Sequence, residues 1–257
     1  MDEIRRLAPR SVLQPGGRET SEERQLQNAP AAARLTYCGE RPKGGTLVAR
    51  PSVRRGGATM NANLRFRRAR ESDVLDLVCL IDSASRGLAL WLWSTLRVPG
   101  QSTIEVGRHR IRTLSASPLY YGAFTVAEID GVIAGALTGR LIPIPYERGD
   151  SADLPDVFAP LLELEAVAAG SWYLTIVSVY PEFRGRGLGS ALLGKAEEIA
   201  RLAEVAQMSL IVEEANAGAL RLYLRYGFEE WSRRPYIAFP GSKDEGDWIL
   251  LKKEIAR

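Results

Sequence analysis

Apolar and polar residues begin to follow a regular pattern at Leu64, and the pattern continues almost to the end of the chain. Residues 64–68 (LRFRR) alternate, which predicts a strand. A helix is predicted next, because a Ser-Asp pair at 72–73 favours a helix start and four apolar residues follow at helical spacing. These four are Val74, Leu77, Val78 and Ile81.

Two more helices are predicted, one over 87–100 that Pro99-Gly100 ends and one that begins after Ser102. Asp130-Gly131 then joins two strands, because this dipeptide favours a tight hairpin turn. Strands and helices alternate after a Pro-rich loop, which favours a mixed sheet covered by helices. The predicted segments are strand 171–180, a helix to about 205, strand 208–214, helix 217–226 and strand 247–253.

Residues 1–59 show neither the two-residue period of a strand nor the 3.6-residue period of a helix, and they are rich in Gly, Pro, Arg, Ser and Ala. We therefore expect a disordered basic extension over 1–59 and a folded domain over 60–257. Because Met60 stands directly before the patterned segment, one hypothesis is that the functional product starts there and that the preceding codons are a start-site artefact. A basic tail that contacts acidic partners is the alternative.

Composition narrows the function classes. The net charge of +3 divides into +5 for residues 1–60 and −2 for the remainder, so the folded body offers little support for nucleic-acid binding. Two cysteines and the single His109 give no metal-ligand spacing. No apolar run reaches the roughly 18 residues of a membrane span, and the N-terminus lacks the apolar core of a signal peptide. We expect a soluble, cytoplasmic protein without a metal.

The glycine-rich stretch FRGRGLGSALLGKA at 183–196 is the strongest candidate for chemistry. A P-loop is rejected, because Ala196 stands where Ser or Thr should hold magnesium. A dinucleotide fingerprint is weak, because Ser190 stands where the third glycine should be. The remaining interpretation is a tight turn and a fresh helix N-terminus whose backbone N–H groups converge on one anion, which suits a pyrophosphate. Arg184 and Arg186 add positive charge at its rim.

Two motifs here resemble the GNAT superfamily of acetyl-CoA-dependent N-acetyltransferases. The family pattern [RQ]-x-x-G-x-[GA] is matched by Arg184, Gly187 and Gly189, and Val179-Tyr180-Pro181 partly matches the approach to it. The second pattern, Asn-x-x-Ala-x-x-Leu-Tyr-x-x-x-Gly-Phe, is matched by Asn216, Ala219, Leu222, Tyr223, Gly227 and Phe228. The resemblance covers 173–228 strongly, and it has no counterpart for 1–59.

The resemblance implies a GNAT fold, an α/β (α+β) mixed sheet of six to seven strands in which 173–180 splays from the next strand. The opening between those strands would hold the pantetheine arm of acetyl-CoA on main-chain groups of Val177, Ser178 and Val179. The diphosphate would lie on the turn and helix start formed by Arg184, Gly185, Arg186, Gly187, Leu188, Gly189 and Ser190. Asn216 would contact the pantetheine or turn the chain. Tyr223 would protonate the departing thiolate, with Tyr226 as a nearby competitor.

No motif in the sequence assigns the general base or the acceptor. Glu163, Glu165, Glu213 and Glu214 stand near predicted strand ends, and none is assigned as catalytic. Acceptor specificity is expected in 83–120 and 141–165, where Trp91 or Trp93 would line the pocket or pack in the core.

The resulting hypothesis is acetyl transfer to a primary amine of a small molecule or peptide, by a monomer or homodimer without nucleic-acid or membrane partners. The alternative is a non-catalytic acyl-CoA-binding sensor or regulatory module.

Overall fold

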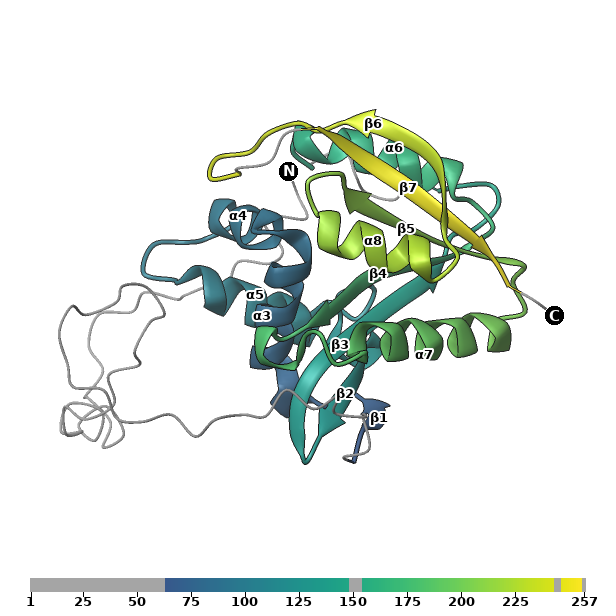
Figure 1. Cartoon of the computed structure of the whole chain (residues 1–257). Coiled ribbons are helices and arrows are strands. Elements are labelled where there is room, and N and C mark those ends of the chain that lie inside the picture. Colours follow the sequence, from purple (N-terminus) through teal and green to yellow (C-terminus); the bar gives the residue numbers. More distant parts are fainter. Residues whose placement is uncertain (1–62, 148–153, 243–245, 256–257) are drawn as a thin grey trace, which may run out of the picture. The chain divides into compact units, whose positions relative to one another are not determined.

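The structure, a computed structural model, describes residues 63–147, 154–242 and 246–255. Within these residues, seven strands form one mixed sheet in the order β1-β2-β3-β4-β5-β7-β6 (Figure 1). The strands are β1 (Arg65–Arg68), β2 (Thr125–Ile129), β3 (Val132–Leu141), β4 (Trp172–Val179), β5 (Gln207–Glu213), β6 (Glu229–Pro235) and β7 (Asp247–Glu254). The helices are α3 (Val74–Ser85), α4 (Leu88–Thr95), α5 (Thr103–Thr113), α6 (Ala159–Val167), α7 (Leu188–Leu202) and α8 (Ala217–Arg225). The expected mixed sheet flanked by helices is confirmed.

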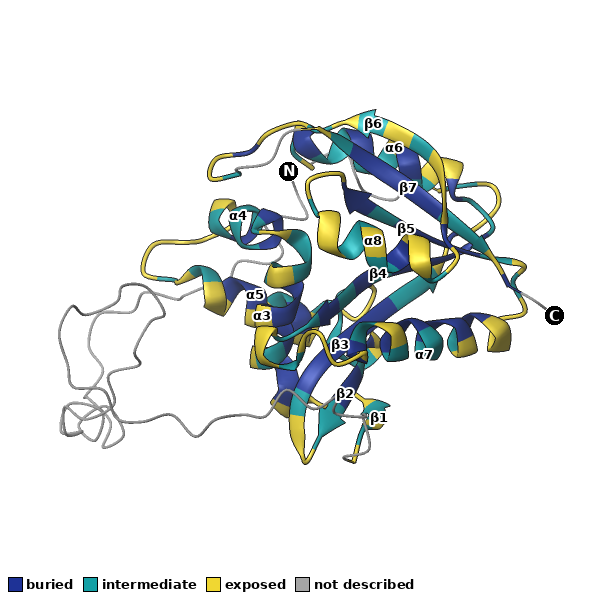
Figure 2. Ribbon diagram, viewed as in Figure 1, coloured by how far each residue is buried: buried dark blue, intermediate teal, exposed yellow. Residues whose placement is uncertain are grey.

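Helices cover both faces of this sheet, and the side-chain alternation of β4 shows which helix lies on which face. Val177 packs in the apolar cluster that contains α7 and α8, whereas Ile176 packs in the cluster that contains α3 and α5. A third cluster joins α6 to the face of β7 opposite α8. Figure 2 shows the central strands buried between these layers, as expected of a sheet covered on both faces.

Neighbouring strands β4 and β5 are parallel, but they pair only at their beginnings. Trp172 pairs with Met208 and Tyr173 with Ser209, and no further pair follows although β4 continues to Val179. Ser171 directly precedes this short ladder, and its buried hydroxyl lies 2.6 Å from the buried hydroxyl of Ser209, within the ladder, in a hydrogen bond. The two strands therefore diverge from a narrow base, as the resemblance to the GNAT superfamily implies.

A β-bulge in β4 lies just beyond the last β4–β5 pair. Thr138 of β3 pairs with Ile176 and Gly139 with Leu174, which leaves Thr175 as the extra residue of β4. A bulge bends its strand and increases its twist, so it favours the divergence of β4 from β5. Gly139 is needed at this point, because a Cβ there would lie 2.4 Å from the Trp172 ring.

Local signals account for several element boundaries. Asp130 and Gly131 adopt left-handed φ values of 52° and 82°, as the predicted hairpin requires. The Ser102 hydroxyl accepts from the Glu105 amide while the Glu105 carboxylate accepts from the Ser102 amide, a reciprocal capping box that starts α5. Strand β6 was not predicted, because it is an edge strand of mostly exposed, charged residues without apolar alternation.

Asp73, at the start of α3, is buried and fixes the entry of the chain into the fold. Its carboxylate accepts from the Arg67 guanidinium at 2.6 Å and 3.2 Å and from the Arg70 amide at 2.7 Å. Burial alone would raise the pKa of Asp73, but these hydrogen bonds outweigh it and hold the pKa below its ordinary value. The carboxylate is therefore charged in the folded protein at neutral pH.

We expect Asp73→Asn to lower the free energy of unfolding at pH 7 by about 2–3 kcal/mol, because the Arg67 charge loses a buried partner. A depressed folded pKa stabilises the protein above the unfolded value of about 3.9, and that contribution is lost as pH falls through the folded pKa. Urea unfolding at pH 7 and at pH 3 should therefore show a smaller difference between variant and wild type at the lower pH. A difference independent of pH would contradict this account.

Candidate active site

One cavity of about 590 Å³ occupies the opening between β4 and β5. It is lined from β4, the loop before α7, the first turn of α7, the end of β5, helix α8 and the end of α3. The predicted site residues on its wall are Val177, Ser178, Val179, Arg184, Gly185, Gly187, Leu188, Gly189, Ser190, Asn216 and Tyr223. The segments 177–190 and 216–223, which carry the two motifs, thus line the same cavity.

Five of the six consecutive residues from Gly185 to Ser190 line this cavity, all except Arg186. The amide of Arg184 donates to the Pro181 carbonyl and that of Ala191 to the Gly187 carbonyl, but the amides between them have no acceptor among the described residues. Gly185 and Gly187 have φ values of 72° and 84°, a conformation that glycine adopts at little cost. Free amides at a helix N-terminus bind anions, since the helix dipole adds about half a positive charge.

The two arginines of the turn differ in position. The Arg184 guanidinium donates to the Val179 carbonyl at 3.0 Å and to the Ser83 hydroxyl at 3.2 Å, so it ties the turn to β4 and α3. The Arg186 guanidinium lies over the Phe183 ring at 5.8 Å, and Arg186 is not among the residues that line the cavity. The Arg184 guanidinium thus already has two acceptors and the Arg186 side chain lies away from the cavity, whereas the amides of the turn have no acceptor among the described residues.

Main-chain groups of β4 alternate between β3 and the opening. The Tyr180 amide donates to the Ala134 carbonyl of the β3 side, so the main chain of Ser178, two residues earlier, also faces β3. Val177 and Val179 consequently turn their amides and carbonyls toward the opening, and Arg184 already donates to the carbonyl of Val179. Of the three predicted pantetheine contacts, the structure favours the main chain of Val177 and the amide of Val179.

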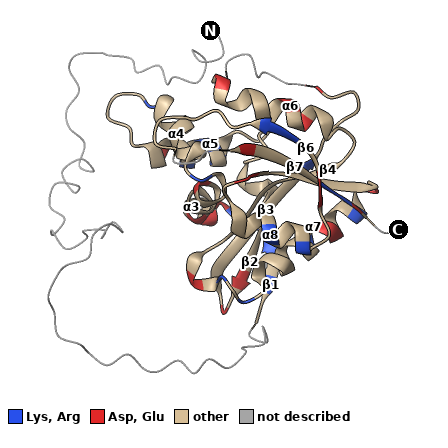
Figure 3. Cartoon of the chain, turned by 45° about the horizontal axis from the view of Figure 1, so that its top comes forward, with Lys and Arg blue, Asp and Glu red and all other residues tan. Residues whose placement is uncertain are grey.

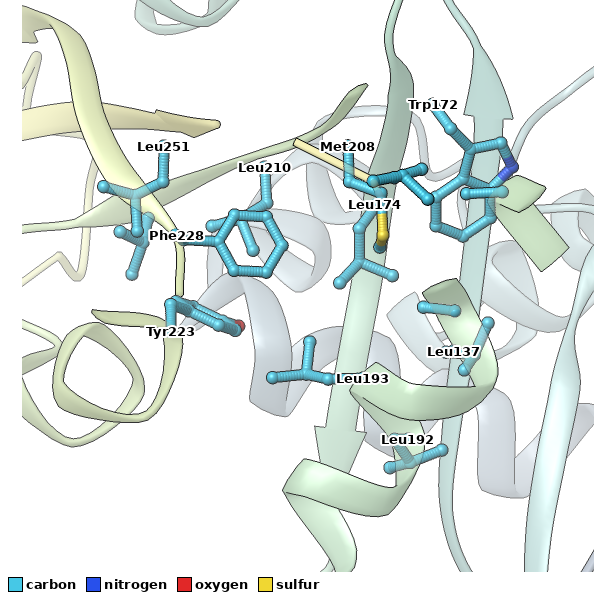
Figure 4. Packing of buried hydrophobic residues seen from close by; sticks show 14 of the residues in the cluster. Leu137, Trp172, Leu174, Leu192, Leu193, Met208, Leu210, Tyr223, Phe228 and Leu251 are labelled. Carbon is cyan, nitrogen blue, oxygen red and sulfur yellow. The ribbon is translucent and has the colours of Figure 1, made fainter. Parts of the chain in front are cut away.

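Tyr223 lies on α8 at the cavity wall and is 8% exposed. Figure 4 shows its side chain beside Phe228 in the apolar cluster. Its ring packs edge-on against Phe228, with the ring centroids 6.1 Å apart. No hydrogen bond of the Tyr223 hydroxyl to another described residue is present. Burial raises the pKa of Tyr223 well above its ordinary value, so the phenol remains protonated at neutral pH. A proton donor must carry its proton, and Tyr223 meets that requirement at neutral pH.

Asn216 and Tyr226 have structural partners. The Asn216 side-chain oxygen accepts from the Ala219 amide at 3.3 Å and caps α8, which supports the chain-turning role of this residue. The Tyr226 hydroxyl donates to the Glu197 carboxylate at 3.2 Å, and Tyr226 does not line the cavity. Of the two tyrosines, Tyr223 is therefore the better placed to protonate a thiolate in the cavity.

Comparison with known proteins identifies the family. The profile described as "Acetyltransferase (GNAT) family" matches residues 90–228, which is more than half of the chain. This chain belongs to the GNAT acetyltransferase family. The uncharacterized N-acetyltransferase MJ1207 of Methanocaldococcus jannaschii is 46% identical over 54 residues, which make up 21% of this chain and 24% of that protein. The match thus spans about a quarter of that relative.

Solved structures agree on the fold. A crystal structure titled as an acetyltransferase is 21% identical, covers 75% of this chain and 100% of its own, and gives a TM-score of 0.51. An N-acetyltransferase from Staphylococcus aureus Mu50 is 18% identical, covers 73% of this chain and 99% of its own, and gives a TM-score of 0.50. At these identities the structural similarity establishes the GNAT fold alone. Members of the GNAT family use acetyl-CoA as the acetyl donor.

The four glutamates named as possible bases have different surroundings in this GNAT protein. Glu163 pairs with Arg234 and Glu214 with Arg233, and both glutamates are largely exposed. Glu165 lies 2.6 Å from Arg140, and burial raises the pKa of Glu165. Glu213 alone among the four lines the cavity.

The two tryptophans of α4 do not line the GNAT cavity. Trp93 is 2% exposed and packs against Gly107, whereas Trp91 packs against Phe239 with ring centroids 5.4 Å apart. Of the two possibilities for these residues, core packing is the one found.

Some cavity residues of the GNAT site were missed in the sequence. Ser83, Ala84 and Arg86 come from the end of α3, and Ile211 and Trp248 come from β5 and β7. None of them belongs to a family motif. The residues from α3 fall within the range 83–120 in which acceptor specificity was expected, and Ile211 and Trp248 fall outside both expected ranges.

The described residues contain no group of three or more His, Cys, Asp or Glu placed to hold a metal ion. In the same part of the chain, no helix has both the length and the apolar character that crossing a membrane requires. Lys, Arg, Asp and Glu are interspersed over the helices and strands of the described domain (Figure 3).

Proposed function

We propose that this protein is an N-acetyltransferase that transfers the acetyl group of acetyl-CoA to a primary amine by direct attack in a ternary complex. The single observation that carries this proposal is the row of six amides, Gly185 to Ser190, that have no acceptor among the described residues and stand at a cavity lined by five of these six residues and by Tyr223. Family membership supports the choice of donor. The acceptor is the amine of a small molecule or peptide, and the protein acts as a monomer or homodimer.

The residues of the chain fit the donor in three places. The amides of Gly185 to Ser190 bind the diphosphate, and the glycines allow it to approach the backbone closely. The main chain of Val177 and the Val179 amide bind the pantetheine arm as an added strand would. An amide of β4 that points into the opening also polarises the thioester carbonyl, a type of contact worth about 10²-fold or more in rate.

The transfer requires two proton movements. The acceptor must lose a proton to a base, directly or through water, before it attacks, because an alkylammonium with a pKa near 10.4 has no lone pair to donate. The neutral amine then forms the C–N bond as the C–S bond breaks, and the sulfur leaves as thiolate. Tyr223 gives its phenolic proton to that sulfur, and the phenolate regains a proton from solvent or from the acylated nitrogen.

Isothermal titration with acetyl-CoA, followed by measurement of CoA release across a panel of amines, tests this function. We expect a dissociation constant in the micromolar range and CoA release that depends on at least one amine. Binding without release on any amine would instead support a non-catalytic acyl-CoA-binding module. Absence of binding would contradict both functions.

A further inference from the structure

An ion pair lies in the cavity wall, and the proposed transfer assigns it no role. Arg86 Nε lies 2.6 Å from the carboxylate of Glu213. The Arg86 side chain is 33% exposed, whereas that of Glu213 is only 4% exposed. Both residues line the cavity between β4 and β5. The pair therefore joins the end of α3 to the end of β5 inside the hollow.

The side chain of Glu213 lies on the face of the sheet opposite α8. Val212 belongs to the apolar cluster that contains α7 and α8, and side chains alternate along β5, so Glu213 and Ile211 point to the other face. Trp248 pairs with Glu213 in the sheet and therefore shares its face, and it too lines the cavity. The cavity thus reaches both faces of the sheet through the opening, and Arg86 and Glu213 lie on the side away from α8.

The backbone of Arg86 is in a conformation that favours glycine. Its φ is 51°, and Gly87 follows with a φ of 95°, so two successive left-handed residues turn the chain from α3 into α4. A left-handed conformation is costly for a residue with a side chain, and such residues cluster at functional sites. Glycine at this position would relieve the strain, but it would also remove the guanidinium from the cavity.

Stability is a weak explanation for this pair. Moving two charges out of water costs free energy that their attraction often fails to recover, and apolar replacements of such pairs are frequently neutral or stabilising. Recognition is a better explanation, since a guanidinium binds a carboxylate in bidentate geometry and a buried carboxylate binds an ammonium group. Arg86 and Glu213, in direct contact, present one charge of each sign to a ligand.

We propose that Arg86 and Glu213 bind an acceptor that carries a carboxylate next to its amine, that is, an α-amino acid. Glu213 binds the ammonium group, Arg86 binds the carboxylate, and the ion pair opens to admit both. Ile211 and the Trp248 indole provide an apolar wall for the rest of the acceptor. This inference rests on the proposed acetyl transfer and names its substrate class.

The test compares each amino acid with the amine that remains when its carboxylate is removed. L-Phenylalanine with 2-phenylethylamine, L-leucine with 3-methylbutylamine and L-lysine with cadaverine are suitable pairs. For at least one pair, we expect kcat/KM of CoA release to be at least tenfold higher for the amino acid. Isothermal titration of the CoA-saturated protein with each acceptor measures acceptor binding without turnover.

Substitution of the arginine distinguishes recognition from a structural role. Arg86→Gln should lower kcat/KM for the preferred amino acid at least 30-fold and that for its matched amine no more than threefold, with unchanged affinity for acetyl-CoA. Glu213→Gln should lower both at least tenfold through a higher KM. Arg112→Gln, which removes an arginine paired with Glu71 on the exposed surface, is the control and should change neither. If Arg86→Gln does not fold, Arg86→Lys should still reduce the preference at least fivefold.

The outcomes separate this inference from the function on which it rests. Turnover of amines without any preference for the amino acids, or a preference that survives in Arg86→Gln, would overturn the inference and leave the acetyltransferase function intact. Absence of acetyl-CoA binding would overturn both.

Discussion

Replacing Tyr223 with phenylalanine should lower kcat at least tenfold while changing the affinity for acetyl-CoA less than twofold. The phenylalanine ring keeps the packing against Phe228, so the substitution removes little more than the hydroxyl. Without that hydroxyl the thiolate must take its proton from water, and positioned general acids contribute about 10²–10⁴-fold. Steady-state kinetics with a saturating amine, together with titration of acetyl-CoA, measures both quantities.

Tyr226→Phe is a matched control on the same helix. It removes a phenol that donates to Glu197 away from the cavity, so kcat should remain within twofold of wild type. Loss of this hydrogen bond should cost about 1 kcal/mol of stability. Equal turnover in Tyr223→Phe and wild type would remove Tyr223 from the mechanism, and a slow Tyr226→Phe variant would transfer the role to Tyr226.

Ser190→Asp should weaken acetyl-CoA binding at least 30-fold without destabilising the protein. Ser190 is the third residue of α7, it lines the cavity, and its amide has no acceptor among the described residues. A carboxylate about 5 Å from one diphosphate charge costs about 3 kcal/mol at an effective dielectric of 20. The same carboxylate in the first turn of a helix is stabilising by about 0.5 kcal/mol, because it complements the helix dipole.

Ser190→Asn is the neutral control of nearly equal size, and its affinity for acetyl-CoA should remain within threefold of wild type. Isothermal titration and thermal unfolding of the two variants separate charge from shape. Ser190→Asp should have a melting temperature equal to or above that of Ser190→Asn. Unweakened binding in Ser190→Asp would show that the diphosphate lies elsewhere, which would contradict the anion-binding role of the turn.

Local signals in the sequence were enough to predict the turn before α7 and most element boundaries. The glycines of 185–189 need no partner elsewhere in the chain to specify a turn, and the Ser102–Glu105 capping box likewise lies within four residues. Edge strand β6 escaped prediction because its pairing with β7, rather than any apolar alternation of its own, makes it a strand.

Contacts between distant segments were beyond sequence reasoning. Arg86 and Glu213 are separated by more than a hundred residues, and only the packing of α3 near the end of β5 brings them together. The direction of the Ser178 main chain depends on the β3–β4 register, which is set in part by the bulge at Thr175. The position of the Arg184 guanidinium depends on Val179 and Ser83, which belong to two different elements.

The short ladder between β4 and β5 has a mechanical consequence. The sheet consists of a four-stranded part, β1 to β4, and a three-stranded part, β5, β7 and β6. Two residue pairs and the hydrogen bond between the Ser171 and Ser209 hydroxyls connect these two parts. A pantetheine chain bound along Val177 and Val179 would occupy the place where further β4–β5 hydrogen bonds would otherwise form. If acetyl-CoA binds as proposed, it would connect the two parts of the sheet where the polypeptide itself does not, and the donor would serve as a structural element of the enzyme.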